Sequence, residues 1–157
     1  MIDTQELLAV AARHPLPPGY AFSADPGRFD ADLVHHWLST DAYWALGRSR
    51  EAQAQMLAGS LVHGVYEEET GAQVGCARVV TDLAAFAYLC DVYIAPEARG
   101  RGLGTSFVAA VLADVVRRAP HGMRRVLLAT EDAHGVYAKL GFAALPDPAQ
   151  WMVLGGP

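Results

Sequence analysis

Arg99-Gly100-Arg101-Gly102-Leu103-Gly104 is the stretch that decides the fold of this 157-residue chain. It follows an apolar run, Phe86 to Ile94, with the composition of a strand, and it precedes a helical pattern that begins near Leu103. A glycine turn between a strand and a helix leaves several backbone N–H groups unpaired at the positive end of the helix dipole, where a phosphate can approach them closely. The stretch therefore predicts a phosphate cradle, to which Arg99 and Arg101 add positive charge.

Three kinds of phosphate-binding turn share this outline. A Walker loop carries a lysine followed by Ser or Thr at the end of its glycine run, and this turn has no lysine. A dinucleotide-binding turn has a further Gly or Ala where this chain has Thr105, and it lies early in a doubly wound sheet, whereas this turn lies near residue 100. The pattern that remains is Arg-x-x-Gly-x-Gly, formed by Arg99, Gly102 and Gly104.

The segments on either side of the turn make this pattern more specific. Asp91-Val92-Tyr93-Ile94-Ala95-Pro96-Glu97 precedes it, and Tyr137-Ala138-Lys139-Leu140-Gly141-Phe142 follows the next helix and strand. This order of elements and motifs resembles the GNAT superfamily of acyl-CoA-dependent N-acetyltransferases. The resemblance covers residues 60–154 well and the first 60 residues only by the order of elements. It implies an α/β (α+β) fold with a mixed, mostly antiparallel central sheet, a splayed parallel strand pair and flanking helices.

Composition sets limits on the class of protein. A chain of 157 residues with 52% hydrophobic and 18% charged residues predicts a single domain with its own core. The net charge of -5 argues against a nucleic-acid partner and favours neutral or cationic acceptors. No apolar run approaches the roughly 18 to 20 residues of a membrane helix, and residues 1–6 lack the basic region and apolar stretch of a signal peptide. We therefore expect a cytoplasmic protein with no membrane partner.

The chain has two cysteines, Cys76 and Cys90, which lie inside apolar strand patterns with no His or Cys at metal-like spacing. This predicts buried, reduced thiols and no metal site. Neither cysteine has an obvious histidine partner in the sequence, which favours direct acyl transfer without a covalent acyl-enzyme.

Periodicity and turn signals predict the remaining elements. Helices are expected over residues 3–12, 29–38, 48–58, 103–119 and 132–140. Strands are expected over residues 20–24, 61–66, 73–81, 85–94, 125–130, 142–145 and 151–154. The strands before and after the glycine-started helix should be parallel neighbours because such crossovers are right-handed. The resemblance implies that these two strands splay apart and admit the pantetheine arm.

Acetyl-CoA is the donor that the resemblance implies, held largely by main-chain groups. Backbone groups of Val92, Tyr93 and Ile94 would pair with the pantetheine amides and polarise the thioester. The pyrophosphate would be held by the turn residues Arg99, Gly100, Arg101, Gly102, Leu103, Gly104 and Thr105. Thr130 stands where many relatives carry an Asn that bonds the cofactor, and its hydroxyl can make one such bond but not the amide's two-sided pairing.

Tyr137 occupies the position at which family members usually place a tyrosine that donates a proton to the departing sulfur. A phenol with a pKa of about 10 is protonated at neutral pH and is close in acidity to an alkyl thiol. The alternative is an aromatic side chain that packs under the Leu-Gly-Phe turn. Asp91 is the candidate base, since burial would raise its pKa, but a structural role is an equal alternative. His134 and a water chain to bulk solvent are further candidates for the base.

The loop between the second and third expected helices, residues 39–47, is the candidate acceptor site. Tyr43 and Trp44 are predicted to form a wall for an apolar or cationic part of the acceptor, with core capping as the alternative. Arg48 either binds an acceptor carboxylate or begins the next helix on its solvent side, and the second interpretation is favoured. Trp151 is predicted in the core.

The sequence thus predicts an N-acetyltransferase that moves an acetyl group from acetyl-CoA directly to a primary amine of a small molecule or peptide. Two rival hypotheses are a non-catalytic acyl-CoA-binding or regulatory module and an enzyme that binds ATP or NAD at the glycine turn. A homodimer stays open, since members of the family often dimerise.

Overall fold

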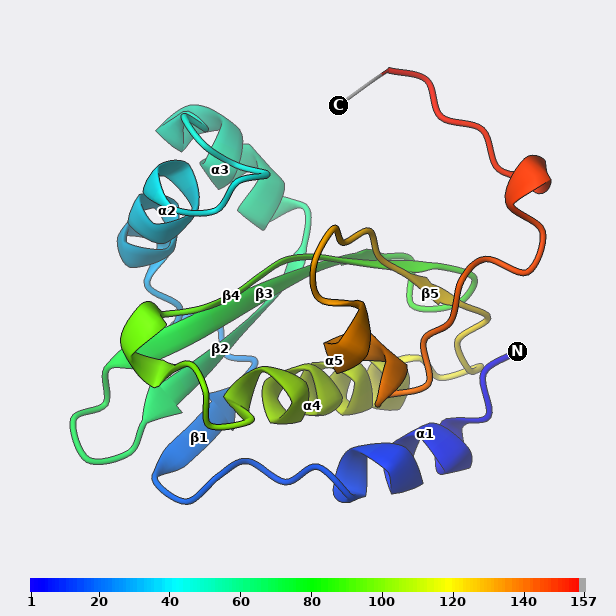
Figure 1. Cartoon of the computed structure of the whole chain (residues 1–157), viewed down its shortest axis with the longest axis horizontal. Helices are drawn as coiled ribbons and strands as arrows, with labels where there is room; N and C mark the ends of the chain where they lie inside the picture. Colours follow the sequence, from blue (N-terminus) through cyan, green and yellow to red (C-terminus); the bar gives the residue numbers. More distant parts are fainter. Residues whose placement is uncertain (156–157) are drawn as a thin grey trace.

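The computed structural model describes residues 1–155, and its centre is a mixed sheet in the order β1-β2-β3-β4-β5 (Figure 1). Each of the first four strands is antiparallel to its sequence neighbour, whereas β4 and β5 are parallel, as predicted. The strands are β1 (Tyr20–Ser23), β2 (Leu61–Glu67), β3 (Gln73–Thr81), β4 (Ala87–Ile94) and β5 (Val126–Leu127).

Helices cover both faces of the sheet (Figure 1). Helices α1 (Thr4–Ala12) and α4 (Leu103–Arg118) pack together on one face, and α2 (Ala31–Thr40) and α3 (Arg50–Ala58) lie on the other. The short helix α5 (His134–Ala138) lies beside α4, and two 3-10 turns occupy Pro96–Ala98 and Pro148–Gln150. One apolar core joins α4 to the sheet, and a smaller one joins α2 to β3 and β4.

Side-chain caps explain where three of the helices begin. Asp3 accepts hydrogen bonds from the Gln5 and Glu6 amides, Asp30 from the Leu33 amide, and Ser49 from the Ala52 amide. Each such cap stabilises a helix by about 1 kcal/mol. The second and third helices therefore start two residues later than the apolar spacing predicted, because the capping residue itself stays outside the helix.

The parallel pair is short. Pairing between β4 and β5 is confined to Ala87 with Val126 and Tyr88 with Leu127, although β4 continues to Ile94. The strand predicted over 125–130 was too long, because its second half diverges from β4 instead of forming a ladder. This divergence is the predicted splay, and it opens the sheet at one end.

The predicted strands 142–145 and 151–154 are not formed, and this prediction was wrong. Apolar composition alone does not make a strand, and the two-residue β5 offers almost no ladder to extend. Pro146 and Pro148 break the segment further, since proline cannot donate a backbone hydrogen bond. Met152 is 97% exposed, and Trp151, which was predicted in the core, is 39% exposed.

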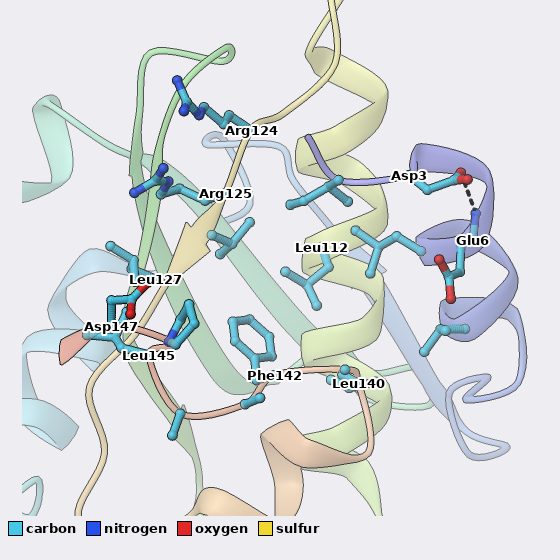
Figure 2. A pocket seen from close by; sticks show the side chains of 18 of the residues that line it. Asp3, Glu6, Leu112, Arg124, Arg125, Leu127, Leu140, Phe142, Leu145 and Asp147 are labelled. Carbon is cyan, nitrogen blue, oxygen red and sulfur yellow. Dashed lines mark hydrogen bonds between the residues drawn. The ribbon is translucent and has the colours of Figure 1, made fainter. Parts of the chain in front are cut away.

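Figure 2 shows the hollow, of about 740 Å³, that lies between α1, α4, β5 and the segment that follows α5. Its wall is largely apolar, with Leu112, Leu140 and Phe142 pointing inward, while Arg124 and Arg125 lie at one end. None of the residues that the sequence analysis assigned to chemistry lines it. Within residues 1–155, no helix is both long and apolar enough to cross a membrane.

Candidate active site

A cleft of about 830 Å³ opens where β4 and the chain after β5 diverge. Its walls come from β4, from the loop after α2, and from the segment that connects β5 to α5 (Figure 1). The cleft brings together the predicted residues Tyr43, Trp44, Asp91, Val92, Tyr93, Ile94, Arg99, Thr130 and Tyr137. Residues far apart in the chain that were selected for separate chemical reasons therefore share one site.

Strand β4 is kinked where it borders the cleft. Asp91 has φ +51°, a left-handed conformation that non-glycine residues rarely adopt, and the β3–β4 register shifts between Cys76 and Arg78. Such a residue costs about 1 to 3 kcal/mol and persists only where its surroundings hold it. The bulge shifts the register of β4, whose pairing with β3 resumes at Tyr93 and Ile94, and no pattern in the sequence signalled it.

The glycine turn leaves open space at the start of α4. Gly100 and Gly102 have φ +78° and +74°, and a Cβ added at either would meet no atom within 4 Å. At Gly104, an added Cβ would meet only Ile94 Cγ1, at 4.0 Å. No side chain caps α4, so its first N–H groups have no side-chain acceptor. A phosphate fits this arrangement of open space, free amides and a 16-residue helix.

The two arginines of the turn hold it in place. Arg99 Nε donates to the Ile94 carbonyl at 2.8 Å, and its Nη2 lies 3.3 Å from Asp41 Oδ2. Arg101 Nη1 donates to the Tyr20 hydroxyl at 2.6 Å. Both guanidinium groups are thus hydrogen-bonded within the protein. Of these two arginines, Arg99 lines the cleft and Arg101 does not.

Tyr137 packs under the Leu-Gly-Phe turn and also lines the cleft. Its ring packs edge-on against Phe142 at 5.8 Å, and its carbonyl accepts the amides of Leu140 and Phe142, which closes the Leu-Gly-Phe turn. Its side chain also lines the cleft, and its hydroxyl bonds to no residue between 1 and 155. Burial, followed by the nearby Asp132 and Tyr43, raises the pKa of Tyr137, so its hydroxyl holds its proton at neutral pH.

Asp91 does not have the properties expected of a base. Arg48 Nη1 and Nη2 donate to its two oxygens at 2.8 and 3.1 Å, Arg78 Nε at 2.9 Å, and Trp44 Nε1 at 3.0 Å. Burial raises the pKa of Asp91, but the bonds and charges of the two arginines outweigh it, so the pKa is lowered. The expectation of a raised pKa was wrong. Arg48, expected on the solvent side, is only 13% exposed in its side chain.

Residues 31–142 match the family model of the GNAT acetyltransferases. The chain belongs to the GNAT acetyltransferase family. A Gibberella zeae protein provisionally described as an acetyltransferase is 32% identical over 137 residues, which is 76% of each chain. A Xanthomonas campestris structure, provisionally described as a GNAT acetyltransferase, is 38% identical, with a TM-score of 0.81 over 90% of this chain and 96% of that one. A Mycobacterium tuberculosis structure in complex with CoA and NLQ shares the fold, at 16% identity and a TM-score of 0.65 over 80% and 72% of the two chains.

In this GNAT protein, Tyr43 and Trp44 line the cleft and belong to neither apolar core, so the core-capping alternative is wrong. Tyr43 and Trp44 pack edge-to-face at 5.0 Å and are 46% and 44% exposed, while Ala42 and Ala45 from the same loop are buried instead. The Tyr43 hydroxyl accepts the Glu131 amide across the cleft at 3.3 Å. The loop therefore contacts the opposite wall.

Two polar residues of the cleft are already engaged. The Thr130 hydroxyl accepts the Ala133 amide at 3.1 Å, which leaves its proton and one lone pair for a ligand. The Tyr93 hydroxyl donates to Asp41 Oδ2 at 2.5 Å, and burial together with this carboxylate raises the pKa of Tyr93 to about 12. Tyr93 thus offers its backbone to the cleft, while its ring stacks on Trp37 of α2 at 5.4 Å.

The cleft contains one thiol, that of Cys90, and burial raises its pKa to about 11. No histidine lines the cleft, and His134 lies outside it. Across residues 1–155, no group of three His, Cys, Asp or Glu side chains is placed to hold a metal ion. A protonated thiol without a neighbouring base is a poor nucleophile, so the site has no residue suited to carry an acyl group.

Proposed function

We propose that this GNAT protein transfers an acetyl group from acetyl-CoA directly to a primary amine of a small molecule or peptide. The observation that carries the proposal is the free Tyr137 hydroxyl in a cleft whose other wall is the bulged end of β4. The family membership supports the acetyl donor, and the openness of the glycine turn supports a place for its pyrophosphate.

The donor would lie along β4 and the start of α4. Acetyl-CoA supplies an activated thioester with a thiolate leaving group. The amides at the start of α4 would bind the pyrophosphate, and the backbone from Val92 to Ile94 would pair with the pantetheine arm. Arg99 links these two regions through its bond to the Ile94 carbonyl, so the phosphate and pantetheine sites are held in a fixed relation.

Tyr137 would act on the leaving group. As the amine nitrogen bonds to the acetyl carbon and the carbon–sulfur bond breaks, Tyr137 would donate its hydroxyl proton to the sulfur and recover a proton from solvent. Its raised pKa keeps it protonated before the reaction. General acid catalysis of this kind contributes about a hundred- to ten-thousandfold in rate.

The proton of the attacking ammonium would leave to solvent. Asp91 has its oxygens occupied by four donors, and Asp41 has a pKa lowered first by its bond from Tyr93 and then by Arg99. Neither of these two carboxylates is suited to accept a proton near neutral pH, and the other two carboxylates of the cleft, Glu131 and Asp132, lie on the facing wall. The Cys90 thiol is protonated as well, which supports a direct transfer in a ternary complex.

Thiol release from acetyl-CoA, measured over a panel of primary amines, tests the proposal. We expect turnover with at least one amine class and its strong reduction in Tyr137→Phe. A non-catalytic module would bind coenzyme A and release no thiol with any amine. A nucleotide-dependent enzyme would be stabilised against heat by ATP or NAD and not by coenzyme A. Either result would overturn the proposal.

A further inference from the structure

The acceptor side of the cleft holds an unbalanced positive charge. Arg48 from the loop before α3 and Arg78 from β3 share one carboxylate, that of Asp91 on β4. Both arginine side chains are 13% exposed, and that of Asp91 is 5% exposed. Two guanidinium charges against one carboxylate leave one positive charge without a partner in a half-buried wall, which is costly unless an anion can reach it.

The arginines also keep unused hydrogen-bond donors. Besides Asp91, Arg48 donates to Gln53 Oε1 at 3.0 Å, and Arg78 to the Ser60 hydroxyl at 3.1 Å. Arg48 Nε and Arg78 Nη2 donate to no residue in the described part of the chain. A guanidinium carries five N–H donors, so each arginine can still bond an acceptor oxygen.

These free donors belong to side chains that line the cleft. Arg48 and Arg78 both line it. In residues 1–155, three buried side-chain polar atoms have no hydrogen-bond partner: Gln53 Nε2, His63 Nδ1 and Tyr66 Oη. The free nitrogens of Arg48 and Arg78 are not among these fully buried atoms. The Gln53 side-chain amide lies next to Arg48, since its Oε1 accepts from Arg48, and its Nε2 is a further donor without a partner in these residues.

We infer that the amine acceptor carries a carboxylate, which Arg48 and Arg78 bind beside Trp44. This inference rests on the proposed function. A carboxylate is planar and presents two oxygens, and each of the two arginines has one nitrogen free to bond an oxygen. It would also neutralise the surplus charge that Asp91 leaves.

The facing wall of the cleft suits the amine end of such an acceptor. Glu131 and Asp132 line the cleft in the segment between β5 and α5, and neither forms an ion pair in the described structure. Asp41, the other carboxylate besides Asp91, is engaged by Tyr93 and Arg99. A molecule with an ammonium and a carboxylate can therefore meet opposite charges on the two walls.

Matched pairs of acceptors test the inference directly. We would measure kcat/KM for 4-aminobutyrate against 4-aminobutanamide and for β-alanine against β-alaninamide, with O-phosphoethanolamine as the phosphate comparison. The carboxylates should be about ten- to a hundredfold better than their amides, the range expected of a charged hydrogen bond. Equal kcat/KM within each pair, or a preference for the phosphate, would overturn the inference while leaving the acetyltransferase proposal intact.

Variants locate the effect. Arg78→Gln should remove most of the carboxylate preference by raising KM for the acids and not for the amides, and Arg78→Lys should restore part of it. Arg50→Gln is the matched control, because Arg50 is exposed and pairs with Asp32 on the surface. A carboxylate preference that survives unchanged in a folded Arg78→Gln protein would contradict the assignment.

Binding without turnover separates the two proposals. Calorimetry with the protein saturated with coenzyme A should detect 4-aminobutyrate and not 4-aminobutanamide. If the acid binds but no amine ever releases thiol, the carboxylate site stands and the acetyltransferase proposal fails. If amines react but neither the binding nor the kinetic preference appears, the carboxylate site fails.

Discussion

Replacing Gly104 by Glu should make the folded protein more stable and weaken its binding of coenzyme A. Gly104 is the second residue of α4, and its φ is not left-handed. An added Cβ meets only Ile94 Cγ1 at 4.0 Å, an ordinary contact. Glu favours a helix over Gly by about 0.5 to 1 kcal/mol, and an acid at a helix N-terminus adds about 0.3 to 1 kcal/mol. Because α4 has no acidic residue in its first turn, both effects add, and the free energy of unfolding should rise by about 0.8 to 2 kcal/mol.

The same carboxylate would stand where the pyrophosphate is proposed to bind. Two unit charges 4 Å apart repel by about 4 kcal/mol at an effective dielectric constant of about 20. The turn is open to solvent, so we expect a loss of more than about 2 kcal/mol, which is roughly a thirtyfold or greater increase in the Kd for coenzyme A. Gly104→Gln has nearly the same size without the charge, and the difference between the two variants isolates the electrostatic part.

Chemical denaturation of the ligand-free proteins and calorimetry with coenzyme A at two salt concentrations give both quantities. The Glu variant should recover part of its affinity at high salt, because salt screens an exposed charge pair. Coenzyme A binding equal to that of the parent protein in both variants would refute the cradle. Gly102→Glu is a less clean test, since Gly102 has φ +74° and a side chain there also strains the turn by about 1 kcal/mol.

Three more predictions follow from the site and the core. Tyr137→Phe should lower turnover by about ten- to a thousandfold. Its melting temperature should be nearly unchanged, because the Tyr137 hydroxyl bonds to no described residue. Full turnover in an assay that chemistry limits would leave Tyr137 with a packing role only. Trp44→Ala should raise the acceptor KM far more than the acetyl-CoA KM. Trp44→Phe, which keeps an aromatic ring but loses the bond to Asp91, should raise the acceptor KM less than Trp44→Ala does. Equal effects on both KM values would remove Trp44 from the acceptor wall. His63 is fully buried and bonds to Asp114 at 2.9 Å, and burial lowers its pKa despite that bond. As the pH falls below about 6.5, the His63 imidazole therefore takes up a proton in the unfolded chain before it does so in the folded protein. The free energy of unfolding should fall there by up to about 1.4 kcal/mol per pH unit. Urea titrations between pH 5 and pH 7.5 should show this slope in the parent protein and a flatter one in His63→Gln, and identical slopes would contradict it.

The elements that carry strong local signals could be predicted from the sequence. Strand β3 has the predicted bounds, and α4 begins at the predicted Leu103, because the apolar strand pattern and the glycine turn are encoded within the segments themselves. The starts of α2 and α3 were misplaced by two residues because the caps Asp30 and Ser49 stay outside the helices although the apolar spacing includes the residues around them. Tyr137 was found through its motif, and the cleft contains it.

The acceptor wall could not be predicted in the same way. The bonds of Asp91 reach Arg48, which lies 43 residues away in the chain, and Arg78 across the β3–β4 bulge. No local pattern encodes which charged residues meet after the chain folds. The length of β5 was misjudged for the same reason, since residues 128–130 have no partner strand once β4 has diverged.

The sharing of Asp91 by two arginines bears on what the second arginine is for. One bidentate guanidinium, such as that of Arg48, is sufficient to neutralise a buried carboxylate, and removing every partner of such a group costs about 3 to 5 kcal/mol. Arg78 makes a single further bond to Asp91 and another to Ser60, so the fold keeps a compensated carboxylate when either arginine is replaced alone. Replacing Asp91 instead would leave two half-buried cations together and would remove the side-chain bonds that hold this left-handed residue of β4 in place. Asp91 therefore needs only one of the two cations for its own neutralisation. The other is left to bind the acceptor's carboxylate, and Asp91 holds both arginines at the cleft.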